Sequence, residues 1–248
     1  MAGSAALQTP LSVDGGRLLV VPGIDQRLSP GADDRPGGVD GPPVVVLLHG
    51  AGSGTDTPLM RRLADLLGAA GVTVGRLEMP YRVAGRRAPD RPARLDAVLV
   101  AAVAALAGQP ATGSDARPRR LALAGASMGS RVAVRTARAV GACAVLALGF
   151  PLHPPGDRPS RQPELSGAGV PVRVVQGERD SFGRPAADPD RGVEVVVVAG
   201  ADHSFKVRVR DGRCADDVVT EAAMLGATWL LRQLNVSSPL VGGADRPG

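Results

Sequence analysis

Six short runs of apolar, mostly β-branched residues recur along this chain, and stretches of helical period lie between them. The runs cover Val44–Leu48, Val72–Leu77, Leu121–Ala124, Ala144–Leu148, Val172–Val175 and Val193–Val198. Most of these runs lack the strict polar alternation of a half-exposed strand, which is typical of strands buried on both faces of a sheet. Strands that alternate with helices predict an α/β fold with a doubly wound, mostly parallel sheet. One more run, Leu18–Val21, is predicted to begin an antiparallel edge before the parallel part of the sheet.

Four helices are predicted between and after these runs. Thr57 is a suitable N-cap for a helix over Pro58–Gly68, which has proline in its first turn. Apolar residues spaced i, i+3, i+4 and i+7 across Leu95–Leu106 indicate a second helix with a buried face. A third helix is expected directly after Ser127, and a fourth over about Ala215–Leu234.

The length of 248 residues, 44% of them hydrophobic, suits one buried core. We expect a single domain over residues 11–235 and a flexible C-terminal tail over residues 236–248. Segments 24–43, 108–119 and 151–170 are rich in proline, glycine and polar residues, so they are predicted to be irregular surface loops.

The positive charge of the chain comes almost entirely from arginine, because only Lys206 among its 29 basic residues is a lysine. The arginines are interspersed with acidic and apolar residues, and the aromatic residues number only one Trp, one Tyr and three Phe. Nucleic-acid binding needs a clustered basic face, usually with stacking aromatics. We therefore expect no nucleic-acid partner.

The sequence also favours a cytoplasmic protein without a membrane partner. Residues 1–10 lack the basic and apolar parts of a signal peptide, and the longest apolar run, Ala97–Ala107, is far shorter than the ~20 residues of a membrane-spanning helix. Cys143 and Cys214 show neither a disulfide framework nor metal-ligand spacing. We expect no metal and no cofactor, and the sequence does not indicate the oligomeric state.

The strongest local signal is the G-x-S-x-G sequence Gly125–Gly129, centred on Ser127. It lies directly after one predicted strand and directly before a predicted helix. A serine in such a tight turn presents its hydroxyl above the sheet, and the flanking glycines let the helix and the strand approach closely. The context therefore predicts that Ser127 is a nucleophile, whereas the alternative is a tight turn without chemistry.

A nucleophilic serine needs a base, and the base needs an acid that orients it. The chain order expected for this type of sheet is serine, acid, histidine, with each residue at the end of a later strand. Asp180 follows the run Val172–Val175, and His203 follows the run Val193–Val198. We predict Ser127, Asp180 and His203 as a catalytic set, with Glu178 as a weaker candidate acid and Asp202 as a loop residue.

Acyl transfer also needs donors for the developing oxyanion. The backbone N–H of Met128, which follows the serine, is one predicted donor. The other is expected in the glycine-rich loop 49–54, where Ala51 is the first choice and Gly52 the second. His49, which begins this loop, is interpreted as a brace rather than a base.

The same glycine-rich loop has a rival interpretation. Gly50, Gly52 and Gly54 after a strand are similar to a dinucleotide-binding fingerprint, with Glu78 as the residue that would bind a ribose. That fingerprint needs its third glycine at position 55, which is Thr55. It also leaves Ser127, Asp180 and His203 unexplained, so we favour the oxyanion role.

Motif by motif, the chain resembles the α/β-hydrolases, and within them the small dienelactone-hydrolase-like group. It is similar there to bacterial relatives of testis-expressed protein 30 and of the third subunit of the NSL histone-acetyltransferase complex. Five segments carry the resemblance: His49–Gly54, Met79–Arg82, Gly125–Arg131, Phe150–Gly156 and Gly177–Gly183. Ser130 stands where that group tends to carry glycine. The resemblance implies an α/β-hydrolase fold and hydrolase chemistry without an agreed substrate.

In this fold a lid is usually inserted after the strand that follows the serine-bearing helix. Segment 151–170 occupies that place, and its prolines leave no room for a helical cap with its own core. We therefore expect no cap domain and a site that is covered only by loops.

The predicted function is that of a carboxylesterase-like serine hydrolase, which cleaves an ester or related acyl bond of a small substrate. The alternative from another class is a hydrolase-fold binding or scaffold protein that keeps these residues without turnover. His153 is interpreted as a substrate contact or as a ring packed in a proline-rich loop. Arg82 and Arg131 are each expected either to bind an anion or to pair with Glu78 or an aspartate.

Overall fold

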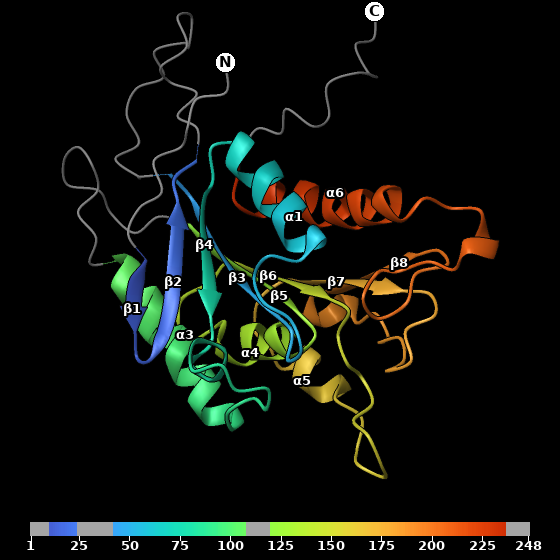
Figure 1. Ribbon diagram of the computed structural model, residues 1–248, viewed down its shortest axis with the longest axis horizontal. Helices are drawn as coiled ribbons and strands as arrows, with labels where there is room; N and C mark the ends of the chain where they lie inside the picture. Colours follow the sequence, from blue (N-terminus) through green and yellow to red (C-terminus); the bar gives the residue numbers. More distant parts are fainter. Residues whose placement is uncertain (1–9, 24–41, 108–119, 237–248) are drawn as a thin grey trace, which may run out of the picture.

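The computed structural model describes residues 10–23, 42–107 and 120–236. One eight-stranded sheet runs through these residues in the order β1-β2-β4-β3-β5-β6-β7-β8 (Figure 1). Strands β3 to β8 pair in parallel, whereas β2 is antiparallel to both β1 and β4. The strands are β1 (Leu11–Val13), β2 (Gly16–Val21), β3 (Val44–Leu48), β4 (Thr73–Glu78), β5 (Leu121–Ala126), β6 (Ala144–Leu148), β7 (Val172–Gly177) and β8 (Val193–Val198).

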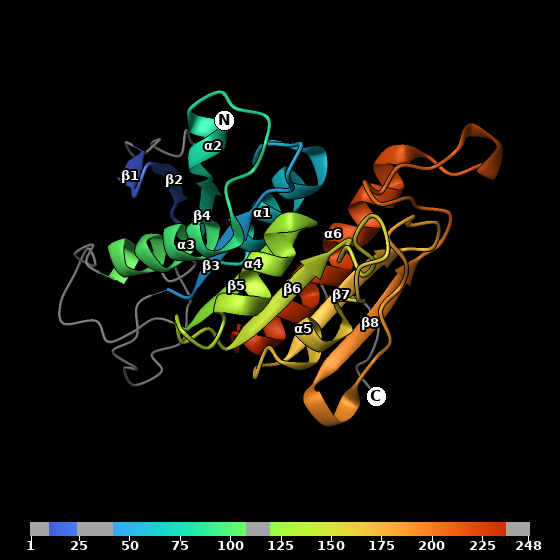
Figure 2. The ribbon, with the colours of Figure 1, turned by 90° about the horizontal axis from the view of Figure 1, so that it is seen from below.

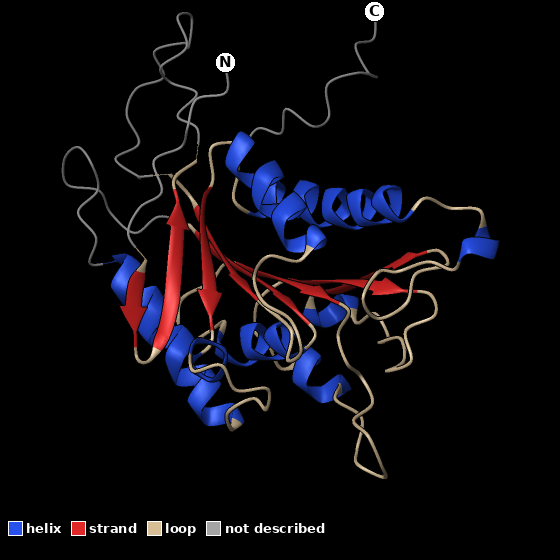
Figure 3. Ribbon diagram, viewed as in Figure 1, coloured by secondary structure: helices blue, strands red, loops and turns tan. Residues whose placement is uncertain are grey.

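Helices cover both faces of the sheet (Figure 3). Helices α1 and α6 pack on one face, and α3, α4 and α5 lie on the other, where Figure 2 shows them over the strands. The helices are α1 (Pro58–Ala69), α2 (Pro80–Val83), α3 (Pro92–Ala107), α4 (Met128–Thr136), α5 (Gln162–Ser166) and α6 (Ala215–Gln233), and single 3₁₀ turns are η2 (Pro189–Arg191) and η3 (Val209–Asp211). None of the described helices is long and apolar enough to cross a membrane.

The central strands are apolar along their whole length because alternate side chains enter different layers. In β3, Val46 and Leu48 belong to the core beneath α3 and α4, whereas Val45 and Leu47 belong to the core beneath α1 and α6. All five residues of β3 are buried. The α/β architecture with a doubly wound, mostly parallel sheet that the sequence predicts is therefore confirmed.

Helix α1 shows how closely local sequence determines its element. Thr57 is the N-cap, and its Oγ1 accepts a hydrogen bond from the Met60 N–H at 3.3 Å. Pro58 occupies the first helical position, where its missing N–H costs nothing. Leu63 and Leu67, one turn apart, are both fully buried against the sheet.

The antiparallel edge predicted to begin at Leu18–Val21 is confirmed, because β2 pairs antiparallel with β4. The outermost strand, β1, was not predicted, and it pairs antiparallel with the other side of β2. Segment 151–170 is not wholly irregular, because α5 forms within it and buries Leu165 under α4. Residues 24–41 of the predicted loop 24–43, the whole predicted loop 108–119 and residues 237–248 of the predicted tail 236–248 lie outside the described residues.

The parallel strands all deliver their carboxyl ends to one edge of the sheet, so the loops that follow β3, β5, β7 and β8 meet there. The connection between β6 and β7 is the place where a lid would be inserted. It contains α5 as its only helix, and it forms no cap domain over this edge.

Candidate active site

Ser127 occupies a sharp turn between β5 and α4. Its φ of 51° and ψ of −113° fall in a region that residues with a side chain rarely adopt. The turn is tied to the sheet, because the Ser127 N–H donates to the Leu148 carbonyl of β6 at 2.9 Å. The strained geometry holds the Ser127 side chain at the carboxyl end of the sheet, as the G-x-S-x-G context predicts.

The two flanking glycines make this turn possible. A Cβ on Gly125 would lie 2.2 Å from the carbonyl carbon of Gly129, and a Cβ on Gly129 would lie 2.5 Å from the Leu48 carbonyl oxygen. Both separations are far below a normal contact, so only glycine lets α4 begin directly against β5 and β3. The motif therefore has a steric origin at two of its three defined positions.

His203, from the loop after β8, reaches the serine. Its Nε2 lies 2.9 Å from Ser127 Oγ, and its Nδ1 lies 2.8 Å from Asp180 Oδ2. A carboxylate only accepts hydrogen bonds, so these partners assign the proton to Nδ1 and leave Nε2 free to accept the serine hydroxyl. The Phe182 ring packs against the imidazole, with centroids 4.5 Å apart.

Asp180, from the loop after β7, is almost wholly buried, with 1% of its side chain exposed, whereas 20% of the His203 side chain is exposed. Asp180 Oδ2 also accepts from Gln176 Nε2 at 2.7 Å, and Asp180 Oδ1 accepts from the Phe182 N–H at 2.8 Å. The structure thus joins Ser127, His203 and Asp180 into one continuous hydrogen-bonded chain.

The two other acidic residues considered for this site face elsewhere. Glu178 is exposed, and its Oε2 accepts from the Gly200 N–H at 2.7 Å. Asp202 Oδ1 accepts from the N–H groups of Ser204 and Lys206, which makes it the cap of its own loop. No hydrogen bond joins Glu178 or Asp202 to His203 among the described residues.

The loop predicted to help bind an oxyanion lies beside the serine. A Cβ on Gly50 would lie 3.5 Å from the Ser127 Cβ. The N–H groups of Ala51, Gly52 and Met128 donate to no described residue. Tyr81 fixes the loop, because its hydroxyl donates to the Ala51 carbonyl at 2.8 Å, and burial raises the pKa of Tyr81 to about 12 so that this proton is retained.

His49 braces the base of the same loop and has no free ring nitrogen. Its fully buried ring accepts the Met79 N–H at Nε2, 3.1 Å away, and donates from Nδ1 to the Gly50 carbonyl at 2.8 Å. Burial lowers the pKa of His49 below the ordinary histidine value. The ring is therefore neutral and structural, as the sequence indicates.

Comparison with known families agrees with this geometry. The sequence profile described as alpha/beta hydrolase domain matches residues 42–230, a span that contains the glycine-rich loop, Ser127, Asp180 and His203. The chain belongs to the alpha/beta hydrolase domain family. This membership leaves the dinucleotide-binding interpretation of the glycine-rich loop without support.

Solved structures share the fold of this hydrolase domain at low sequence identity. A serine hydrolase without a lid from Xanthomonas campestris is 18% identical, with a TM-score of 0.59 over 91% of this chain and 95% of that chain. A dienelactone hydrolase from Anabaena variabilis is 19% identical, with a TM-score of 0.64 over 90% of this chain and 95% of that chain. Est1E from Butyrivibrio proteoclasticus is 14% identical, with a TM-score of 0.63 over 93% of this chain and 100% of that chain. No curated protein matches the chain.

Arg131 forms a structural ion pair, as predicted, but its partner is Glu164 of α5, 2.9 Å away, and not Glu78 or an aspartate. Glu78 pairs with Arg17 of β2. Arg82 forms no ion pair with a described residue, and its Nε is buried without a hydrogen-bond partner among them. His153 is exposed, and its N–H donates to the Phe182 carbonyl at 2.8 Å while its ring lies against Gly183.

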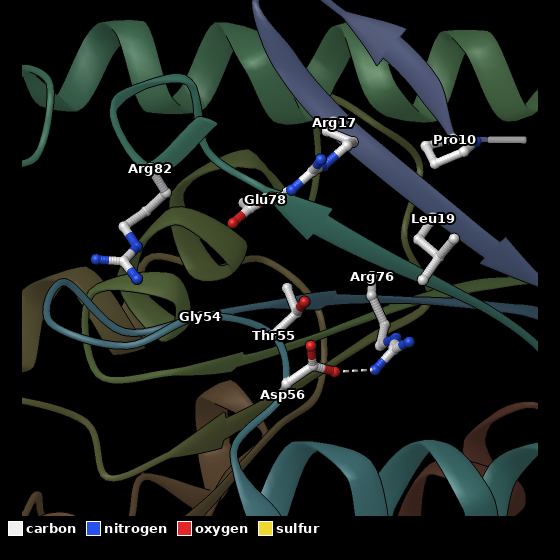
Figure 4. Close-up of a pocket in the computed structure, with 9 residues that line it drawn as sticks. All are labelled: Pro10, Arg17, Leu19, Gly54, Thr55, Asp56, Arg76, Glu78 and Arg82. Carbon is white, nitrogen blue, oxygen red and sulfur yellow. Dashed lines mark hydrogen bonds and ion pairs between the residues drawn. The ribbon is translucent and has the colours of Figure 1, made fainter. Parts of the chain in front are cut away.

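A separate hollow of about 400 Å³ lies between β2, β4 and the loop that precedes α1 (Figure 4). Its charged lining includes Arg76, which pairs with Asp56 at 2.6 Å, and the side chain of Arg82. Ser127 and His203 do not line this hollow. Among the described residues, no cluster of His, Cys, Asp or Glu side chains is arranged to hold a metal ion.

Two residues that contact the Ser127, His203 and Asp180 set were not predicted from the sequence. Gln176 and Phe182 both bond to Asp180, and Phe182 also packs on His203. A signal for Gln176 was present, because it is a polar side chain at the end of an otherwise apolar strand, four residues before the acid. Phe182 carries no comparable signal, because its contact depends on the fold of the loop.

Proposed function

We propose that this domain is a serine hydrolase that cleaves an ester or a related acyl bond of a small substrate through an acyl-enzyme. One observation carries the proposal: the unbroken hydrogen-bond chain from Ser127 Oγ through the His203 ring to Asp180 Oδ2. This is the arrangement in which a neutral imidazole can remove the serine proton while a buried carboxylate stabilises the resulting imidazolium.

In the first half of the reaction, Ser127 Oγ attacks the carbonyl carbon and its proton passes to His203 Nε2. The carbonyl oxygen becomes an oxyanion, which the N–H groups of Ala51 and Met128 receive. The tetrahedral intermediate collapses, the bond to the leaving group breaks, and His203 returns the proton to the departing oxygen. Ser127 then carries the acyl group as an ester.

In the second half, a water molecule replaces the leaving group. His203 Nε2 takes one proton from the water as its oxygen attacks the acyl carbon, and the same N–H groups receive the second oxyanion. Collapse breaks the ester to Ser127 Oγ, which recovers the proton from His203. Asp180 keeps its charge throughout, holding the imidazole in the tautomer that accepts at Nε2.

A fluorophosphonate probe tests the proposal directly, because it phosphonylates only an activated serine. We expect the purified protein to gain the mass of one phosphonyl group, which peptide mapping assigns to Ser127, and to hydrolyse p-nitrophenyl acetate. An unlabelled protein without turnover would instead favour a binding or scaffold role.

Carboxylesterase specificity, a cytoplasmic location and the closer resemblance to relatives of testis-expressed protein 30 remain predictions.

The pH profile should report the histidine base. A histidine base must be neutral to accept the serine proton, so kcat/KM for p-nitrophenyl acetate is expected to fall as the pH is lowered from 8 to 5. Burial lowers the pKa of His49, so His49 takes up its proton at a lower pH than an ordinary histidine. Circular dichroism at each pH controls for unfolding, and a flat profile from pH 5 to 8 would contradict a histidine base.

Acyl-chain selectivity should be weak. The connection between β6 and β7, where a lid would be inserted, contains only the five-residue α5 and forms no cap domain. Full burial contributes about 0.8 kcal/mol per methylene, or roughly fourfold in rate, and an open site should yield only a small part of this. We expect kcat/KM for p-nitrophenyl esters to favour C2–C4 and to vary little among them, without activation at a lipid interface. A steep rise from C2 to C12 would indicate a buried acyl tunnel.

A further inference from the structure

Gln176, the last residue but one of β7, is fully buried although it carries an amide. We infer that it is a positioning residue, whose side chain holds Asp180 in the orientation that faces His203. The inference rests on the proposed function, because it assigns to Gln176 a part in the same hydrogen-bond chain. It adds a fourth member to that chain, one that touches neither the substrate nor the serine.

The amide of Gln176 meets four polar groups. Its Oε1 accepts from the Phe150 N–H at 2.9 Å. Its Nε2 lies 2.7 Å from Asp180 Oδ2, 2.7 Å from the Gly183 carbonyl and 3.1 Å from the Phe150 carbonyl. The three acceptors exceed the two N–H bonds of the amide, so every donor of Gln176 is engaged.

These partners allow only one orientation of the amide. The Phe150 N–H is a donor and can face only Oε1, whereas both carbonyl oxygens and the carboxylate can face only Nε2. A flipped amide would set its NH₂ group against the Phe150 N–H and its oxygen against three acceptors. The donor directed at Asp180 is therefore imposed by the backbone of the loop after β6.

The bond from Gln176 decides which carboxylate oxygen faces the histidine. Asp180 Oδ2 receives both Gln176 Nε2 and His203 Nδ1, while Oδ1 receives the Phe182 N–H. Three donors from three directions hold the plane of the carboxylate. Without Gln176 the carboxylate keeps one backbone tether, and rotation about its Cβ–Cγ bond can take Oδ2 away from His203.

Packing alone does not account for an amide at this position. Neighbouring β7 residues Val174 and Val175 are fully buried and apolar, and a methionine would fill a similar volume. Burying an amide is unfavourable by about 1–3 kcal/mol unless its bonds are made. Gln176 makes them with Phe150 after β6 and with Asp180 and Gly183 after β7, so it joins the two loops that form the acid side of the site.

A double-mutant cycle separates positioning from a purely structural role. The readout is the second-order rate of fluorophosphonate labelling, measured with Gln176→Met in the wild-type and the Asp180→Asn backgrounds. In the wild-type background we expect the rate to fall by about 10–100-fold and kcat for p-nitrophenyl acetate to fall with it, while KM changes little. In the Asp180→Asn background, where no carboxylate remains to be oriented, the same substitution should cost less than about threefold.

Gln176→Glu is the second variant and carries the test if Gln176→Met does not fold. It keeps the size of the side chain and the acceptor for the Phe150 N–H, but it turns an acceptor toward Asp180. Its effect should likewise be large in the wild-type background and small with Asp180→Asn. Thr136→Val, which removes a buried 2.7 Å bond to the Val132 carbonyl in α4, controls for a general loss of stability and should leave the labelling rate unchanged.

An equal loss in both backgrounds would overturn the inference, because it would show that Gln176 acts through the fold and not through Asp180. Labelling of Gln176→Met at the wild-type rate would overturn it as well. Failure of the proposed function looks different, because the wild-type protein itself would then remain unlabelled and without turnover.

Discussion

Replacing Ser127 with alanine is expected to abolish fluorophosphonate labelling and to lower kcat for p-nitrophenyl acetate by about 10⁴-fold or more. The substitution removes the only oxygen that lies within hydrogen-bond distance of His203 Nε2 among the described side chains. The fold should be retained, because the turn is built by the Ser127 N–H and by the flanking glycines and not by the hydroxyl. Circular dichroism and a thermal melt check this.

Ser204→Ala is a matched control for the Ser127 variant. Ser204 adjoins His203 in sequence, is exposed, and its side chain makes no hydrogen bond with a described residue. The Ser204→Ala protein should be labelled by the fluorophosphonate and should hydrolyse p-nitrophenyl acetate at the wild-type rate. Labelling that persists in Ser127→Ala, or that disappears in Ser204→Ala, would place the nucleophile elsewhere.

The sheet could be predicted because its strands are buried in a way that leaves a local trace. Strands β3 and β6 begin and end at the residues expected from their apolar runs, since side chains on both faces enter a core. Elements that bury little left no such trace. Strand β1 has three residues and α5 has five. Both are shorter than the stretches over which a pattern is recognised, roughly 4–8 residues for a strand and about 11–18 for a helix.

The order of the site residues was equally accessible from the sequence. Parallel strands deliver their ends to one edge, so residues that follow β5, β7 and β8 must approach one another even though they are far apart in the chain. Topology brings Ser127, Asp180 and His203 to the same edge, but the 2.8–2.9 Å contacts depend on loop conformations that no periodicity encodes.

The partners of the arginines could not be read from the sequence. The chain has 29 basic and 24 acidic residues, and exposed ion pairs differ little in free energy, so many pairings satisfy the same composition. Arg131 pairs with Glu164 because α5 packs on α4, and Glu78 pairs with Arg17 because β2 lies beside β4. Both choices follow from tertiary contacts between distant segments.

Asp180→Asn is expected to lower kcat by about 10³–10⁴-fold, whereas Glu178→Gln should leave it within about twofold. The asparagine has no acceptable orientation. With its oxygen toward His203 and Gln176, its NH₂ group meets the Phe182 N–H; with its NH₂ group toward His203, it meets the NH₂ group of Gln176 and favours the tautomer that protonates Nε2. In that tautomer His203 cannot accept the proton of Ser127.

Glu178→Gln is the matched control, because it makes the same change from carboxylate to amide two residues away. Glu178 accepts one hydrogen bond, from the Gly200 N–H, and the oxygen of a glutamine can accept it as well. The comparison is made on kcat, fluorophosphonate labelling and thermal stability of both variants. An inactive Glu178→Gln beside an active Asp180→Asn would identify Glu178 as the acid, and would mean that the loop after β7 rearranges when substrate binds.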